Sequence, residues 1–136
     1  KKWKLYLGIF INLFSYLPFV AKKYFRKEAS TRINQILNDH QIDLVHFDML
    51  VLSMYSKYVR SLPKILVNHN VESIRLYRWM KIERNIFIKL FLYYQYLKLH
   101  HYERQICPKF ERCIVVSEQD QKVLEEMCMT NNFVTW

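Results

Sequence analysis

The chain has 136 residues, of which 51% are hydrophobic and 24% charged. This composition predicts one domain with its own core and excludes disorder caused by low hydrophobicity. The formal net charge of +9 implies attraction to an anionic partner such as nucleic acid, anionic lipid or a phosphorylated substrate. The single glycine, Gly8, excludes a glycine-rich loop wrapped around a phosphate.

The first forty residues have helical character, and Pro18 is expected to open a second helix that ends near Asn38. The apolar stretch at 8–20 is shorter than the roughly 20 residues that a membrane span requires. It leads into lysines without a small-residue cleavage site. We therefore expect a cytoplasmic protein with neither a transmembrane helix nor a signal peptide. Because an α/β domain normally starts on a strand and none is predicted here, we also expect sequence upstream of residue 1.

Three short β-rich runs, at 42–47, 64–69 and 112–116, alternate with segments of helical period. Residues 133–136 have the character of a further strand. Near-continuous apolar strands that alternate with helices predict an α/β fold with a Rossmann-like parallel sheet covered on both faces. We expect residues 1–136 to form a single domain of this kind, incomplete at its N-terminal side.

Two segments between the strands predict helices. Residues 49–60 carry Leu50, Met54 and Tyr58 at intervals of four and predict a three-turn crossover helix. Residues 71–105 predict a much longer helical segment with a break inside it, basic in its first half and aromatic in its second. The basic ridge consists of Arg75, Arg78, Lys81 and Arg84, and the aromatic stripe of Phe87, Leu90, Phe91, Tyr94 and Leu97.

The three cysteines, Cys107, Cys113 and Cys128, form neither an even set nor a C-x-x-C pair. This favours reduced thiols in a cytoplasmic protein. A zinc site at His100, His101 and Cys107 is the weaker interpretation, because a second ligand pair at the usual spacing is lacking. We expect no metal.

Ligands of open α/β sheets bind outside the carboxyl ends of the strands, so polar residues at the predicted strand ends are the candidates for a site. His69 ends the second predicted strand, and helix capping gives it no role. We therefore interpret His69 as the candidate catalytic residue, placed to bind or to transfer protons. The other candidates for the binding cleft are His46, Asp48, Asn70, Glu72, Ser117 and Glu118.

Several of these residues also have a purely structural interpretation. Ser117 with Asp120 is typical of a capping box, which we favour over a ligand contact. His46 alternates with apolar residues, as hydrogen-bonded core histidines do. Three others fit the beginnings of helices: Asn70 and Asp48 as N-caps, and Glu72 in a first turn.

The run KILVNHNVES follows LVHFD and precedes a long segment that ends YERQICPKFERCIVVSEQD. In this order the motifs resemble the N-terminal, acceptor-side domain of the retaining family 4 glycosyltransferases, which have the GT-B fold. The upstream runs NLFSYLPFVAKKY and INQILNDHQIDLVHFD are similar to that domain in bacterial polysaccharide-type enzymes. The resemblance covers nearly the whole chain. It implies a parent enzyme that transfers a sugar from a nucleotide-sugar donor to a hydroxyl of a lipid-linked saccharide or polysaccharide precursor, with retention and without a metal.

The resemblance also implies roles for individual residues. His69 matches the family histidine that faces the transferred sugar, with Asn70 and Glu72 beside it. Glu103 matches a family glutamate before the third strand, and we expect it to be structural. The family's glycine-rich loop is expected before residue 1, and its donor-binding domain after Trp136. We therefore expect this chain to contain no cofactor and to be inactive alone.

An enzyme that acts on a lipid-linked acceptor has to bind the inner face of the membrane. The N-terminal segment has the composition of an interfacial amphipathic helix that could do so. The alternative is that this helix packs on the sheet. Its apolar residues are Trp3, Leu5, Tyr6, Ile9, Phe10, Leu13 and Phe14, and the flanking basic residues are Lys1, Lys2, Lys4, Lys22, Lys23 and Arg26.

The alternative function is a basic nucleic-acid-binding module. It would use the basic ridge on phosphates and the tyrosines for stacking. The sequence contains no motif for this role, so we expect no nucleic-acid partner.

Overall fold

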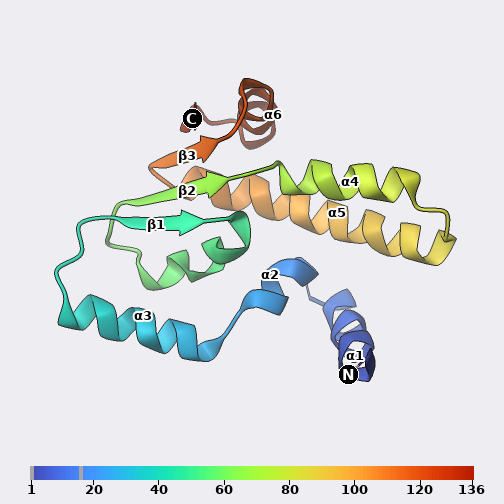
Figure 1. Cartoon of the computed structure of the whole chain (residues 1–136), viewed down its shortest axis with the longest axis horizontal. Helices are drawn as coiled ribbons and strands as arrows, with labels where there is room; N and C mark the ends of the chain where they lie inside the picture. The colour runs from blue at the N-terminus through green and yellow to red at the C-terminus, as the bar shows by residue number, and fades with distance from the viewer. Residues whose placement is uncertain (1, 16) are drawn as a thin grey trace.

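The computed structural model describes residues 2–15 and 17–136, and the side chains of residues 2 and 4–7 lie outside this description. The fold is α/β, with a four-stranded parallel sheet of Rossmann-like character flanked by helices (Figure 1). Its strands are β1 (Val45–Asp48), β2 (Lys64–Asn68), β3 (Arg112–Val115) and β4 (Phe133–Thr135), paired in that order. The predicted parallel α/β class and the predicted fourth strand are confirmed.

The register of the sheet aligns its most buried side chains. Phe47 lies opposite Leu66, Leu66 opposite Cys113, and Cys113 opposite Phe133, and all four belong to the core. The largest difference from the predicted bounds is at the start of the first strand, which was predicted at residue 42 but pairs with β2 only from Val45. The predicted strand ends differ from the observed ones by one residue.

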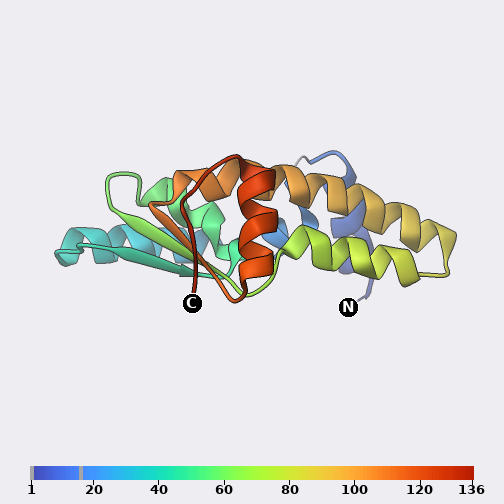
Figure 2. The ribbon, with the colours of Figure 1, turned by 90° about the horizontal axis from the view of Figure 1, so that it is seen from above.

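The helices pack on one face of the sheet, as Figure 2 shows for the segment after β1 and for the long helix before β3. On the opposite face, His46, Arg112 and Val134 are exposed, Ile65 and Ile114 are half-buried, and Val67 is buried. When parallel strands pair in their sequence order and every crossover has the same hand, all the connections lie on one face of the sheet. The prediction of a sheet covered on both faces is therefore wrong for the described residues.

The N-terminal part contains three helices, α1 (Lys2–Leu13), α2 (Phe19–Tyr24) and α3 (Lys27–Asp39). The single helix predicted to run from Pro18 to Asn38 is instead interrupted at Phe25 and Arg26, whose backbones are extended. The hydroxyl of Tyr55 causes this break: it accepts the N–H of Arg26 at 2.7 Å and donates to the carbonyl of Tyr24. Phe25 stacks on the same ring. A tertiary contact therefore divides a segment that is locally helical.

The crossover between β1 and β2 is a 3-10 helix, η1 (Leu50–Tyr58), rather than the predicted α-helix. One row of buried positions recurs every three residues, at Leu50, Ser53, Ser56 and Val59, which fits the three residues per turn of a 3-10 helix, and Val51 and Tyr55 are buried beside it. The row predicted from the sequence, at intervals of four, consists of Leu50, Met54 and Tyr58, and its last two side chains are only partly buried.

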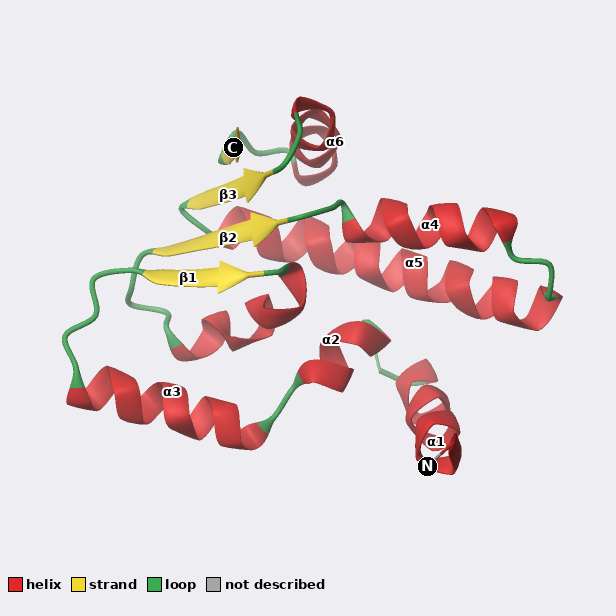
Figure 3. Cartoon of the chain, in the orientation of Figure 1, coloured by secondary structure: helices red, strands yellow, loops and turns green. Residues whose placement is uncertain are grey.

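The long helical segment folds back on itself as a hairpin of α4 (Glu72–Ile82) and α5 (Ile86–Ile106), followed by the short η2 (Cys107–Lys109). The predicted break lies at residues 83–85. Asn85 caps α5 there, because its side chain accepts the N–H groups of Phe87 and Ile88. Figure 3 shows the hairpin extending beyond the carboxyl ends of the strands. The last helix, α6 (Glu118–Cys128), packs on β3 and β4.

The end of α1 is held against α5 rather than against the sheet. The amide of Gln95 donates to the side chain of Asn12, the buried ammonium of Lys98 donates to the Asn12 carbonyl at 2.6 Å, and Tyr94 donates to the carbonyl of Leu13. The alternative that α1 packs on the sheet is therefore wrong for this end of the helix.

The amphipathic pattern proposed for the N-terminus is only partly visible. Lys1 lies outside the described residues, as do the side chains of Lys2, Lys4, Leu5 and Tyr6. Trp3, Phe10 and Phe14 are exposed. Across the described part of the chain, no helix combines the length and the apolar character that crossing a bilayer requires.

Candidate functional site

The carboxyl ends of β1 and β2 bring two of the predicted site residues together. Asp48 is the last residue of β1, and His69 follows the last residue of β2. Nε2 of His69 lies 2.7 Å from Oδ1 of Asp48. The side chain of His69 is 51% exposed, and that of Asp48 is 64% exposed. The parallel register, which pairs Asp48 with Val67, makes these two strand ends neighbours, so the topology explains the contact.

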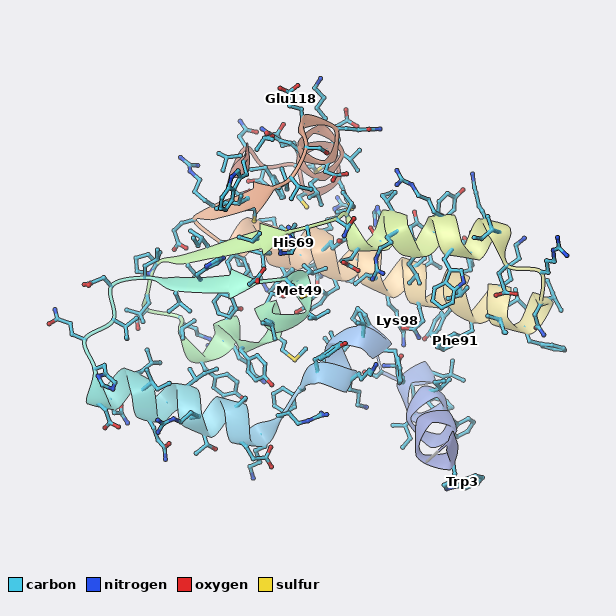
Figure 4. All side chains as sticks on the ribbon, viewed as in Figure 1. Trp3, Met49, His69, Phe91, Lys98 and Glu118 are labelled. Carbon is cyan, nitrogen blue, oxygen red and sulfur yellow. The ribbon has the colours of Figure 1, made fainter. Side chains whose placement is uncertain are left out.

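Met49, which was not predicted as a site residue, has a strained backbone directly after Asp48. Its φ of 87° and ψ of 138° lie in a region that residues other than glycine rarely occupy, and such strain tends to occur at functional sites. The Met49 N–H donates to the carbonyl of Val67 on β2. Met49 lies between β1 and η1, close to His69 (Figure 4), and the Asp48 carboxylate that precedes it contacts the His69 ring. No sequence signal marks the strain, because glycine would be the expected residue.

The contact with Asp48 determines what His69 can offer a ligand. A carboxylate accepts hydrogen bonds, so Nε2 carries the proton and Nδ1 remains available. Among the described residues, Nδ1 has no hydrogen-bond partner. In the neutral imidazole, Nδ1 can therefore accept a hydrogen bond from a hydroxyl or take its proton. Asp48 also orients the ring, which is the usual role of a carboxylate behind a histidine.

Glu103 caps α4 next to this edge. Its carboxylate accepts the N–H of Glu72 at 2.8 Å and that of Ser73 at 3.1 Å, so the cap predicted for Asn70 is wrong. Asn70 does not cap because the α4 N-terminus faces α5, where Glu103 is 99% buried. That burial raises the pKa of Glu103 from 4.5 to about 7, although the two N–H groups act in the opposite direction. Its geometry agrees with the structural role expected for it.

The third strand end does not join the site. Ser117 caps α6, because its hydroxyl accepts the N–H of Asp120 at 3.1 Å, which confirms the predicted cap. Glu118 is exposed on α6, away from His69 (Figure 4).

The remaining candidates lie close in sequence to His69 or Asp48, but among the described residues none of them forms a hydrogen bond or ion pair with that pair. Glu72 is in the first turn of α4, as predicted, and forms an ion pair with Arg75. Asn70 is exposed. His46 is exposed on the uncovered face of β1, so its interpretation as a core histidine is wrong. Asp48 does not cap the following segment either, because its side chain binds His69 instead.

The three cysteines are free and buried. A neighbouring thiol raises the pKa of each of two cysteines most, Cys113 acting on Cys107 and Cys107 acting on Cys128, and burial also raises the pKa of both. They are therefore core residues rather than nucleophiles. Within the described residues, no group of three or more His, Cys, Asp or Glu side chains could hold a metal ion.

A surface groove lies away from the strand ends. It has a volume of about 370 Å³, lies between the end of α1 and α5, and is lined mainly by Leu13, Phe14, Tyr94, Leu97 and Lys98. We place the candidate site at the strand ends, because the paired His69 and Asp48 lie there and the groove holds no such pair. No protein-family profile, no curated protein and no solved structure matches this chain.

Proposed function

We propose that this chain is the acceptor-side part of a retaining glycosyltransferase, in which the carboxyl ends of β1 and β2 contact the acceptor and the transferred sugar. The observation that carries the proposal is the imidazole of His69, held by Asp48 at 2.7 Å on the edge where parallel sheets bind ligands. The resemblance of the sequence to family 4 enzymes supplies the reaction, and its histidine coincides with His69.

His69 would act by positioning. With its Nε2 proton donated to Asp48, its Nδ1 accepts a hydrogen bond from a sugar hydroxyl and fixes that sugar beside the bond that breaks. Transfer with retention depends chiefly on stabilising charge at the leaving diphosphate and on correct placement of the acceptor. A protein nucleophile is not needed for either effect.

The helix N-termini near this edge support the proposal that this chain binds the acceptor and that another part of the parent enzyme binds the donor. N–H groups at the start of α4 are occupied by Glu103, and one at the start of α6 is occupied by Ser117. These groups would otherwise attract a phosphate, and the single glycine, Gly8, lies in α1. The donor diphosphate is accordingly assigned to residues of the parent enzyme outside this chain.

Sugar transfer in the full-length protein tests the proposal. The assay follows a radiolabelled sugar from UDP-linked and GDP-linked donors into a bacterial lipid extract. His69→Ala should lower the transfer rate about a hundredfold, as expected for a lost positioning or proton-transfer group. Because His69 is half exposed, the melting temperature should change little. His40→Ala, at an exposed histidine that ends α3, is the matched control and should transfer normally.

The contact between His69 and Asp48 gives a second, finer test. Asp48→Asn should lower the rate less than His69→Ala, because an amide oxygen can still accept a hydrogen bond from Nε2 but holds the ring less firmly than a carboxylate does. The double variant should be no slower than His69→Ala alone, since Asp48 acts through His69. Full transfer by His69→Ala would remove this edge from the reaction.

A further inference from the structure

The far end of the α4–α5 hairpin exposes an unusual concentration of large apolar side chains. We define the apolar end as Trp79 and Ile82 of α4 with Ile86, Phe87 and Leu90 of α5. All five are more than half exposed, and Ile82 and Phe87 reach 78% and 80%. The aromatic stripe of α5, which pattern alone would assign to the core, continues along the helix from this end, with Tyr94 and Leu97 also exposed.

The two helices contact each other at the hairpin's inner side, and this contact does not account for the apolar end. Met80 and Leu92 are buried there, and Tyr77 packs on Tyr96. The outer end of the hairpin lies beyond the sheet (Figures 1 and 2). A surface helix normally turns a polar side to water. Here the first turns of α5 are apolar on several sides, since Ile86, Phe87 and Ile88 are all exposed. Exposed patches of this kind mark contact surfaces.

The charge around the apolar end is almost entirely positive. Between positions 74 and 98, the only acidic residue is Glu83, and its side chain accepts the N–H of Asn85. Arg78, Lys81 and Arg84 are exposed, and among the described residues no carboxylate lies within ion-pair distance of them. The basic residues of this stretch that remain for a partner are Arg78, Lys81, Arg84 and Lys89, because Lys98 is buried against α1 and Arg75 pairs with Glu72.

We propose that the apolar end of the hairpin docks into an anionic lipid bilayer, with its basic residues on lipid phosphates and its apolar side chains among the acyl chains. Apolar residues flanked by lysine and arginine are the chemistry of interfacial membrane binding. A second copy of the chain is disfavoured as the occupant, because two surfaces of the same strong positive charge would repel each other.

The direction of the hairpin connects this surface to the candidate site. The eleven residues of α4 begin three positions after His69 and extend roughly 16 Å at 1.5 Å per residue. The strands point their carboxyl ends toward the same side (Figure 3). Docking would therefore turn the His69 edge toward the bilayer, where a lipid-linked acceptor lies. This last step rests on the proposed function, but the docking itself does not.

Sedimentation of the full chain with vesicles tests the docking without any transfer assay. We expect binding to vesicles of phosphatidylcholine mixed with phosphatidylglycerol, and weak binding to phosphatidylcholine alone. The double variant Ile82→Asn and Phe87→Asn should bind at least about tenfold more weakly, because two large side chains no longer leave water. Leu44→Asn is the matched control, at an exposed leucine before β1, and should bind as the unaltered chain does.

The basic residues are tested in the same way. Arg78→Gln with Arg84→Gln should weaken binding roughly twenty-five-fold, at about fivefold for each charge near an anionic surface. Arg60→Gln, at an exposed arginine before β2, should not. Equal binding to both kinds of vesicle would overturn the proposal. So would binding that depends on the arginines and is unaffected by Ile82→Asn and Phe87→Asn, which would point to an acidic protein or nucleic acid.

Tryptophan fluorescence locates the contact, because the three tryptophans lie in different places. Trp79 is in the apolar end, Trp3 is in α1, and Trp136 is the last residue. With Trp3→Phe and Trp136→Phe, the emission of Trp79 should move to shorter wavelength on addition of anionic vesicles. A shift seen only in the variant that keeps Trp3 would assign docking to α1 and overturn the proposal for the hairpin.

Discussion

Apolar side chains are buried in the sheet but exposed in the outer half of the α4–α5 hairpin. In the sheet, Leu66, Cys113 and Val115 are completely buried, and parallel pairing satisfies their backbones. In the outer hairpin, Ile82 and Phe87 are almost as exposed as in an extended chain. The first region derives its stability from burial within the chain, whereas the second leaves apolar surface available for another phase or molecule. The candidate site lies at the carboxyl ends of the strands, beside the start of α4.

The largest effect should come from the centre of the sheet. Leu66→Ala removes a side chain with no exposed surface and should lower the free energy of unfolding by about 2–5 kcal/mol, because a cavity remains. Urea unfolding followed by circular dichroism measures the change. A loss below about 1 kcal/mol would mean that the sheet is not the stable core.

The junction of sheet and hairpin should show a dependence on pH. Below pH 4.5 Glu103 is protonated in both states, but between 4.5 and about 7 only the unfolded chain loses the proton. The free energy of unfolding should therefore fall as pH rises through this window, by at most about 3 kcal/mol, and then become constant. Urea unfolding of the unaltered chain and of Glu103→Gln measures this contribution as the difference between their pH slopes. Identical slopes would contradict the raised pKa.

The smallest effect on stability should come from the outer hairpin. Ile82→Asn replaces a side chain that is 78% exposed. The free energy of unfolding, measured by thermal unfolding, should therefore change by no more than about 0.5 kcal/mol. A clear loss would show that Ile82 is already buried in solution, for example between two copies of the chain, and analytical ultracentrifugation would detect that association.

The strands could be predicted from sequence because their apolar runs are local and their ends carry distinct residues. His69 and Asp48 were each predicted at a strand end, and sequential parallel pairing then brings those ends together. The break between α4 and α5 has a local signal in Asn85, which was overlooked.

Other features depend on partners distant in sequence. The interruption at Arg26 depends on Tyr55, 29 residues later, and the cap of α4 depends on Glu103, 31 residues beyond Glu72. The exposure of Phe87 was also unpredictable, because helical periodicity shows that one side is apolar but not what covers it.

Hydrogen–deuterium exchange of the full chain, with and without anionic vesicles, tests most directly whether the two regions have separate roles. Vesicles should slow exchange in the stretch around the hairpin turn, near Ile82 and Phe87, and leave β2 and β3 as they are in solution. Protection in the sheet, with the hairpin unchanged, would contradict the account.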